Sequence, residues 1–210
     1  MTKYLLSVAL FGLSLSVFAQ EKKETGIYFG AIAGTKINDF NKHFAVDIDP
    51  QLYSFSIGAG SALTKNNFIV GFEFLYSAAQ KNNDFGDIQY VGFSNTLSFG
   101  YNVSKSKTWK IEPNLGVVLN NNQLIIQNKN NTNFQNLINN QISGNIGLNI
   151  KAVRKNGLFT GLRFGYMLPF SGETDWKNKV SDSKSGLKDN VGAFHIQLNI
   201  GGLLNLNKIK

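Results

Sequence analysis

Hydrophobic and polar residues alternate with a period of two along most of the chain. In the segment LYSFSIGAG (52–60), large apolar residues alternate with serine and glycine. The segment FIVGFEFLYS (68–77) repeats the pattern and carries Glu73 on its polar face. Because successive side chains of a β-strand point to opposite faces, each such segment predicts a strand with one apolar and one polar or small face. No segment keeps a helical period for more than two turns, so the pattern predicts an all-β protein.

Eight segments have strand length and the alternating pattern: 26–36, 52–60, 68–77, 91–103, 109–120, 141–153, 158–168 and 191–205. Three short connections separate them at 64–67, 104–108 and 154–157, and four longer ones at 37–51, 79–87, 121–140 and 169–190. Tight turns at one end and long loops at the other are typical of outer-membrane barrels. The sequence therefore predicts an eight-stranded antiparallel transmembrane β-barrel with short periplasmic turns and long extracellular loops.

A soluble eight-stranded barrel of the lipocalin type also alternates with period two. Its outer face would be charged, whereas charged residues make up only 16% of this chain. The polar face consists mainly of Gly, Ser, Thr and Asn, which suit the narrow lumen of a small barrel. These features favour the membrane barrel over the soluble one.

The first residues have the composition of a secretory signal. Lys3 forms a short basic region, Tyr4 to Phe18 is apolar, and Ala19 stands where a signal peptidase cuts. We therefore expect a signal peptide at 1–19 and a barrel domain at 20–210. Export of a Gram-negative barrel places it in the outer membrane, and the absence of Cys excludes a lipid-modified N-terminal cysteine, a disulfide and a thiolate zinc site.

The 210-residue chain carries a formal net charge of +8, which becomes +7 once Lys3 is removed with the signal peptide. Its Lys and Arg residues are scattered through short connections rather than gathered on one face, so we expect no nucleic-acid partner. Positive charge suits the anionic head groups of outer-membrane lipid and lipopolysaccharide.

Charged and titratable residues also lie on the polar faces of the predicted strands. The alternation turns six of them towards the lumen: Glu73, Lys110, Glu112, Lys151, Arg163 and His195. Buried charges need partners, and the lumen of an eight-stranded barrel is only just wide enough for side chains. We interpret them as an ion-pair and hydrogen-bond network that fills the lumen; the alternative is a gate for small solutes.

Aromatic residues on the apolar faces are expected at the two membrane interfaces. At the short-turn ends these are Phe68, Tyr101 and Trp109, and at the long-loop ends Tyr53, Tyr76 and Tyr166. The eight-residue step from Phe68 to Tyr76 covers about 20 Å in a tilted strand, close to the thickness of the apolar band.

Two histidines, His43 and His195, are the only candidates for a catalytic base, and neither has a serine at the spacing of a deacylase barrel. Asp47 and Asp49 lack the ligand series of a calcium loop. We therefore expect no enzyme activity, cofactor or metal site, with a lipid A-modifying enzyme as the remote alternative.

Two of the expected loops have unusual composition. The stretch 120–140 is rich in Asn and Gln, which is consistent either with an adhesive loop or with compositional drift at the surface. The loop 169–190 places Trp176 among four lysines, which suits contact with anionic glycolipid or the outer aromatic girdle. Pro113 conflicts with a strand interior and requires a bulge or a strand that starts near Asn114.

The Ala19-Gln20 end of the signal, the first strand GIYFGAIAG and the last strand FHIQLNIGG resemble the small porin-like, or PorT-like, outer-membrane barrels of the Bacteroidota. The resemblance covers nearly all of 20–206 and implies architecture more than activity. Many such barrels end in an aromatic residue that the barrel assembly machinery reads, whereas this chain ends in Lys210.

The function that we expect is a structural or surface-interaction role, exercised by a monomer through its outer loops with an unidentified ligand or protein partner. The alternative is a narrow or gated channel for small solutes.

Overall fold

The structure is a computed structural model, and it describes residues 25–39, 51–82, 86–128, 134–170, 173–189 and 191–206. The expected signal peptide at 1–19 lies outside these residues. Among the described residues there is no helix long and apolar enough to cross a membrane.

Ten strands make up nearly all of the described chain. Their bounds are β1 (Thr25–Asp39), β2 (Gln51–Lys65), β3 (Phe68–Asn82), β4 (Gly86–Tyr101), β5 (Trp109–Asn128), β6 (Phe134–Val153), β7 (Leu158–Pro169), β8 (Thr174–Asn178), β9 (Lys184–Asp189) and β10 (Gly192–Asn205). Each of the eight predicted strands corresponds to one of β1–β7 or β10, and β8 and β9 are additional.

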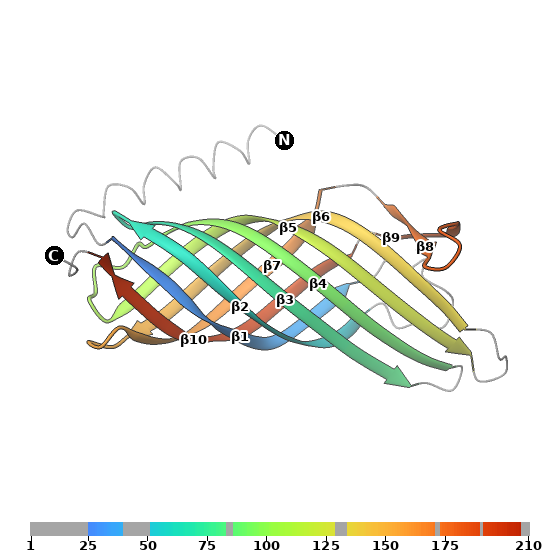
Figure 1. The fold of residues 1–210 in the computed structure, drawn as a ribbon, viewed down its shortest axis with the longest axis horizontal. Helices are drawn as coiled ribbons and strands as arrows, with labels where there is room; N and C mark the ends of the chain where they lie inside the picture. The colour runs from blue at the N-terminus through green and yellow to red at the C-terminus, as the bar shows by residue number, and fades with distance from the viewer. Residues whose placement is uncertain are drawn as a thin grey trace.

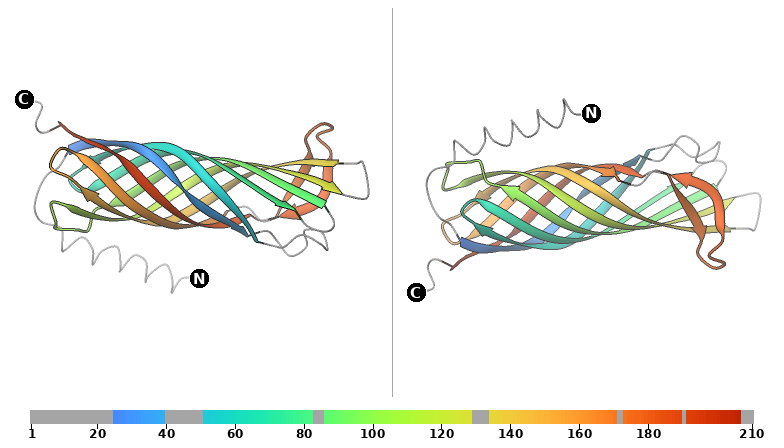
Figure 2. Two further views of the ribbon diagram at one scale, coloured as in Figure 1. Left: turned by 90° about the horizontal axis from the view of Figure 1, so that it is seen from below. Right: turned by 90° about the horizontal axis from the view of Figure 1, so that it is seen from above.

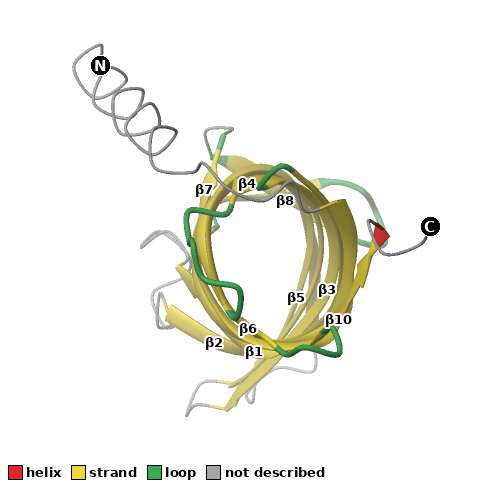
Figure 3. Cartoon of the chain, turned by 90° about the vertical axis from the view of Figure 1, so that its left-hand side faces the viewer, coloured by secondary structure: helices red, strands yellow, loops and turns green. Residues whose placement is uncertain are grey.

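Strands β1–β7 and β10 close into a barrel. The order of neighbours is β5-β4-β3-β2-β1-β10-β7-β6, and an antiparallel β5–β6 pairing closes the ring. The ring is seen end-on in Figure 3, and the oblique strands are seen from the side in Figure 1. The predicted eight-stranded antiparallel barrel is therefore confirmed.

The strands are tilted steeply against the barrel axis, as the two views of Figure 2 show. The stagger of the strands follows from the residue pairs. A path that starts at Glu112 of β5 and steps to the paired residue on each neighbouring strand returns to β5 at Asn122, ten residues further along the strand. The residues on this path are Glu112, Asn149, Arg163, Gln197, Gly34, Ser56, Ser77, Gly92 and Asn122. A stagger of this size in eight strands corresponds to a tilt of about 40° and a lumen that side chains can fill.

The two ends of the barrel differ. At the end that we call the turn end, β1 begins, β10 finishes, and the turns 66–67, 102–108 and 154–157 join neighbouring strands. At the opposite end, the hairpin end, the hairpin β8–β9 lies against the extended wall formed by β5 and β6 (Figure 1).

The connections at the hairpin end differ from the prediction. Strands β3 and β4 continue through most of 79–87, and β5 and β6 pair through most of 121–140, from Asn121↔Asn140 to Gln127↔Phe134. The predicted loop at 121–140 was therefore wrong, and the Asn- and Gln-rich stretch is mainly a rising pair of strands. The predicted loop at 169–190 contains β8 and β9.

The outer surface of the barrel is apolar. Strand β3 alternates exposed and buried side chains, with Phe68, Val70, Phe72 and Phe74 exposed and Ile69 buried. The other barrel strands expose large apolar side chains in the same way, including Phe55, Phe99, Leu115, Ile146, Leu162 and Ile200. A continuous apolar belt of this kind requires a lipid surrounding.

Pro113 lies inside β5, where it faces Leu148 of β6. The β4–β5 ladder ends one residue away, at Gly100↔Asn114. Below it, the N–H of Val103 donates to the carbonyl oxygen of Ile111. The missing N–H of Pro113 therefore falls at a gap in the ladder, and the strand begins at Trp109 rather than near Asn114.

Candidate functional site

The lumen contains the six residues for which alternation predicted an inward orientation. Five of them are buried and Glu73 is half-buried, on the inward faces of β3, β5, β6, β7 and β10: Glu73, Lys110, Glu112, Lys151, Arg163 and His195. The charges form two bridges inside the lumen, one across it between β7 and β3 and one between the neighbouring strands β6 and β5. Nη1 of Arg163 donates to Oε2 of Glu73, and Nζ of Lys151 lies 2.7 Å from Oε2 of Glu112.

The ammonium group of Lys151 has a second set of neighbours. Its Nζ lies 4.3 Å from the ring centroid of Tyr28 and 5.4 Å from that of Phe159. The two rings meet edge to face at 5.6 Å. Carboxylate and aromatic faces together compensate the charge of Lys151 near the turn end of the lumen.

Several lumenal residues were not predicted from the sequence. Lys36 is buried opposite His195, one strand away. The sequence did not indicate that Lys36 points into the lumen, because Tyr28 and Ile32 on the same face of β1 are apolar. The alternation of buried and exposed positions along β1 was the available signal, since Lys36 and Asn38 both fall on its buried positions.

Hydroxyl and amide groups fill the lumen on the hairpin-end side of the ion pairs. Oγ of Ser94 donates to Oδ1 of Asn120 at 2.7 Å, and Nδ2 of Asn120 donates to Oγ of Ser143 at 3.1 Å. Two further contacts cross neighbouring strands, from Asn38 to Ser54 and between Ser56 and Ser77. These short side chains lock adjacent strands together from inside the barrel.

Two apolar clusters lie inside the barrel, one near each end. The turn-end cluster consists of Tyr28, Val153 and Phe159, with Ala62 and Leu203 packed against it. The hairpin-end cluster consists of Leu52, Ile88, Tyr90, Leu124, Leu137, Trp176 and Val191, with Ala79 and Ile126 packed against it. Its members come from β2, β4, β5, β6, the hairpin and the residue before β10, so they converge on the mouth from around the barrel.

Trp176 lies at the centre of this closure, with 0% of its surface exposed. The expectation that Trp176 contacts glycolipid or joins the outer aromatic girdle was therefore wrong, because its ring packs inside the mouth. Strand β8 is held to β6 by the pairs Leu137↔Asn178 and Ile138↔Lys177, and Nδ2 of Asn139 donates to Oγ1 of Thr174 at 2.7 Å.

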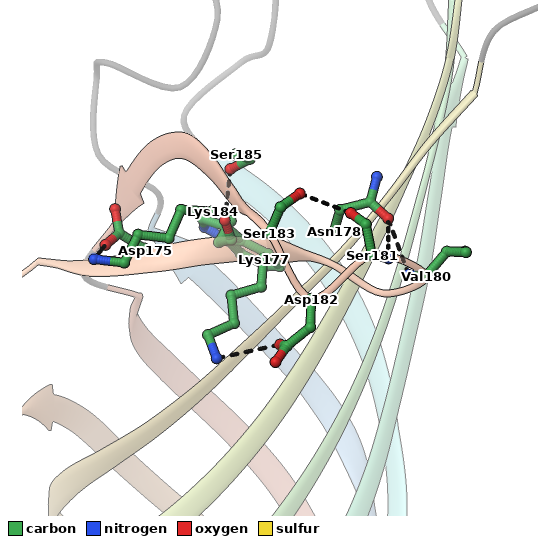
Figure 4. Close-up of polar contacts among 10 residues, drawn as sticks. Asp175, Lys177, Asn178, Val180, Ser181, Asp182, Ser183, Lys184 and Ser185 are labelled. Carbon is green, nitrogen blue, oxygen red and sulfur yellow. Dashed lines mark hydrogen bonds and ion pairs between the residues drawn. The ribbon is translucent and has the colours of Figure 1, made fainter.

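The hairpin itself is held by polar contacts, which Figure 4 shows. Asp175 pairs with Lys184 at 3.1 Å and Asp182 with Lys177 at 3.2 Å. Oγ of Ser185 donates to the carbonyl oxygen of Trp176 at 2.6 Å, which ties β9 to the strand that carries the tryptophan. Lys177 and Lys184 thus each have a carboxylate partner within the hairpin.

A cavity of about 50 Å³ lies in the turn-end half of the lumen, above the turn-end cluster. Its walls include glycines of four strands, Gly30, Gly60, Gly71 and Gly100. Asn114, Asn149 and Asn199 also line it, together with Glu73, Glu112 and Lys151. The lumen between the two clusters is therefore largely polar, with one further buried apolar cluster formed by Val118, Met167 and Ala193.

The predicted interface aromatics all project from the outer surface. The exposed fractions are 65% for Phe68, 54% for Trp109 and 63% for Tyr53, while Tyr76, Tyr101 and Tyr166 are less exposed. Phe68 and Tyr101 stack edge to face at 5.0 Å. Their position at the two lipid interfaces stays a prediction.

Only one of the candidates for chemistry lies within the described residues. His195 faces the lumen, while His43, Asp47 and Asp49 lie outside the described residues. In the described ranges, no group of three His, Asp or Glu side chains could hold a metal ion.

No protein-family model and no curated protein matches the chain. Among solved structures it is similar to Neisserial surface protein A, with a TM-score of 0.51 and 11% identity over 83% of this chain and 96% of that one. The outer membrane protein AlkL, determined in DMPC bilayers, gives a TM-score of 0.51 and 12% identity over 89% and 94% of the two chains. Ail of Yersinia pestis matches at a TM-score of 0.47 and 11% identity over 86% and 99%.

At these identities the likeness concerns the fold alone. It agrees with the closed ring of β1–β7 and β10 and with the apolar belt around it. The finer resemblance to the porin-like barrels of the Bacteroidota is not supported by these matches. The chain is thus a small outer-membrane-type β-barrel.

Proposed function

We propose that this chain is a non-enzymatic outer-membrane barrel that acts at the cell surface through its hairpin end. The observation that carries the proposal is the closure of the mouth by Trp176, which leaves the outer face of this end, rather than the lumen, available to a partner. The turn end, with both chain ends of the barrel, then faces the periplasm.

The polarity of the wall changes along its length, which supports this orientation. In the lower part of β5, Leu115, Val117 and Leu119 point outwards. Closer to the hairpin end of β5, the outward positions carry Asn121 and Gln123, while Leu124 points into the mouth. The upper wall therefore suits water outside and an apolar filling inside, as expected for a part that rises above the membrane.

Lipid and lipopolysaccharide would surround the apolar belt, and the barrel assembly machinery would insert the chain as a monomer. The resemblance to porin-like barrels of the Bacteroidota belongs to the same proposal. It rests on the first and last strands and the expected signal peptide.

Cysteine labelling of intact cells tests the orientation, because the chain has no native cysteine. Val180 of the hairpin is 88% exposed, and Lys105 lies exposed in a turn at the opposite end. We expect a membrane-impermeant maleimide to label Val180→Cys on intact cells and Lys105→Cys only after the cells are broken. The reverse pattern, or labelling of neither variant in intact cells, would contradict a surface role for the hairpin end.

A narrow channel is the second candidate, and the polar lumen with its cavity favours it. Conduction would require the hairpin-end cluster and the turn-end cluster to open and the Arg163–Glu73 bridge to move. Three barriers in series make the closed barrel the better-supported proposal.

A lipid A-modifying enzyme receives no support from the described residues. His195 is buried on the lumenal side of β10, whereas membrane lipid lies against the outer surface. A base in this position cannot reach a lipid acyl chain.

A further inference from the structure

The lumenal cavity carries hydrogen-bonding groups that the protein itself leaves without partners. Oδ1 of Asn114, Asn149 and Asn199 and Oε1 of Glu112 accept no hydrogen bond within the described structure. Glu112, Asn114 and Asn199 are more than nine-tenths buried. All four side chains line the same cavity.

The orientation of one of these groups is fixed by the chain. Nδ2 of Asn114 donates to the carbonyl oxygen of Glu112 at 3.2 Å, so its amide nitrogen is held at the wall and its oxygen is left without a partner. Buried acceptors without donors are costly. The site therefore favours an occupant that donates several hydrogen bonds.

The charges around the cavity select a neutral occupant. Glu112 is already paired with Lys151, and Glu73 with Arg163. An added cation would meet the ammonium of Lys151, and an added anion would meet the two carboxylates. Either charge would be poorly compensated in a lumen of low dielectric constant.

The size of the cavity limits the occupant. A volume of about 50 Å³ corresponds to roughly four water-sized positions. The glycines of the wall set this volume, because a Cβ at Gly60 would lie 2.9 Å from Cγ of Glu73 and one at Gly71 would lie 2.8 Å from Oγ of Ser98. The space suits a three-carbon polyol rather than a sugar ring.

We propose that this cavity is a binding site for a small neutral polyol. The three hydroxyl groups of a three-carbon polyol donate to three of the four acceptors on Glu112, Asn114, Asn149 and Asn199. The site lies inside the barrel and is independent of the surface role proposed above. It lies in the turn-end half of the barrel, where Tyr28, Ala62 and Phe159 of the turn-end cluster form part of its lining.

Solution NMR of the ¹⁵N-labelled protein in detergent micelles, titrated with glycerol, tests the proposal. We expect the side-chain amide signals of Asn114, Asn149 and Asn199 to shift and to saturate with a dissociation constant on the order of 10 mM, as suits a ligand of six heavy atoms. Raffinose has the same hydroxyl chemistry but exceeds the cavity, so we expect no saturating shift with it.

The matched variants are Asn199→Leu and Asn145→Leu. Both replace a buried lumenal asparagine, but Asn145 does not line the cavity. We expect Asn199→Leu to weaken glycerol binding about tenfold or more through the loss of an acceptor, and Asn145→Leu to leave it unchanged. Asn149→Leu serves the same purpose if Asn199→Leu loses the heat-dependent gel mobility of a folded barrel.

Three results would overturn the site: shifts that rise linearly with glycerol without saturating, saturation that is equal for raffinose, or equal weakening by Asn199→Leu and Asn145→Leu. The first would show a solvent effect only. The second would show binding at the outer surface, and the third would place any binding elsewhere in the lumen.

Discussion

Trp176 has the largest side chain among the fully buried residues of the described chain, and it comes from a hairpin rather than from the barrel wall. Its partners are spread over strands that are far apart in the sequence, such as Leu52 on β2 and Leu137 on β6. No local pattern in 169–190 indicates these contacts, and from the sequence we therefore expected Trp176 at the surface. Only the closed barrel brings the partners around it.

We expect Trp176→Ala to release the hairpin from the mouth, because truncating a buried Trp costs about 3–5 kcal/mol. The hairpin's remaining ties to the barrel wall are polar: two residue pairs with β6 and hydrogen bonds such as those from Asn139 to Thr174 and from Lys179 to Gln123. Limited trypsin digestion of the purified protein should then cut at Lys177 or Lys184 at least ten times faster. Val180→Ala, at an exposed position of the same hairpin, is the control and should digest like the unmodified protein.

The ion pair between Arg163 and Glu73 is the second feature that depends on single residues. Glu73→Gln leaves the guanidinium of Arg163 buried without its carboxylate, and breaking one side of a buried pair costs about 3–5 kcal/mol. We expect the urea midpoint of the barrel in micelles to fall accordingly.

The double variant Glu73→Gln with Arg163→Met removes both charges and should recover most of this loss. If Glu73→Gln alone leaves the midpoint unchanged, the pair does not contribute to stability in the folded lumen.

The alternation of the sequence predicted the barrel strands where lipid lies outside and polar groups lie inside. Residues 68–77 and 158–168 show the alternation of exposed and buried positions, and both are strands, although Ile69, Phe159 and Met167 are apolar residues on the inward face. Alternation also predicted which charged residues face the lumen. This prediction requires only that every second residue of a strand points to the same face. The pairs Glu73–Arg163 and Glu112–Lys151 depend on the stagger of the strands, which the sequence does not contain.

The upper parts of β5 and β6 escaped prediction for a physical reason. On the hairpin-end side of the apolar belt, the inward side chains of the wall are apolar and the outward side chains are polar. The polarity of the two faces is therefore exchanged within one strand. In β5 the exchange occurs between Leu119, which points outwards, and Leu124, which points inwards. Asn120, Asn121, Asn122 and Gln123 lie between them and hide the period, so the stretch resembles a loop.

The hairpin β8–β9 is an addition to the barrel rather than a part of it. Strands β7 and β10 pair directly from Gly202↔Leu158 to Ala193↔Met167 without it. We therefore expect a variant in which a short Gly-Ser linker replaces 173–189 to fold, and to keep the heat-dependent shift in gel mobility of a closed barrel. Loss of that shift would show that the hairpin is needed for the barrel to close.

At the scale of the whole molecule, the lumen is a largely polar chamber with an apolar cluster near each end. The turn-end cluster around Tyr28 and Phe159 and the hairpin-end cluster around Trp176 stand at its two ends, and the Arg163–Glu73 bridge crosses the middle. A solute that crossed the barrel would have to displace all three. This arrangement is the reason for proposing that the protein acts through its outer surface rather than through its lumen.

Single-channel recording in planar bilayers tests this account most directly. The account predicts that the purified, folded protein inserts without producing conductance steps, and that Glu73→Gln gives none either, since both apolar closures remain in place. Uniform, long-lived steps from the unmodified protein, altered in size by Glu73→Gln, would show that the lumen is an open path and would contradict the closed barrel.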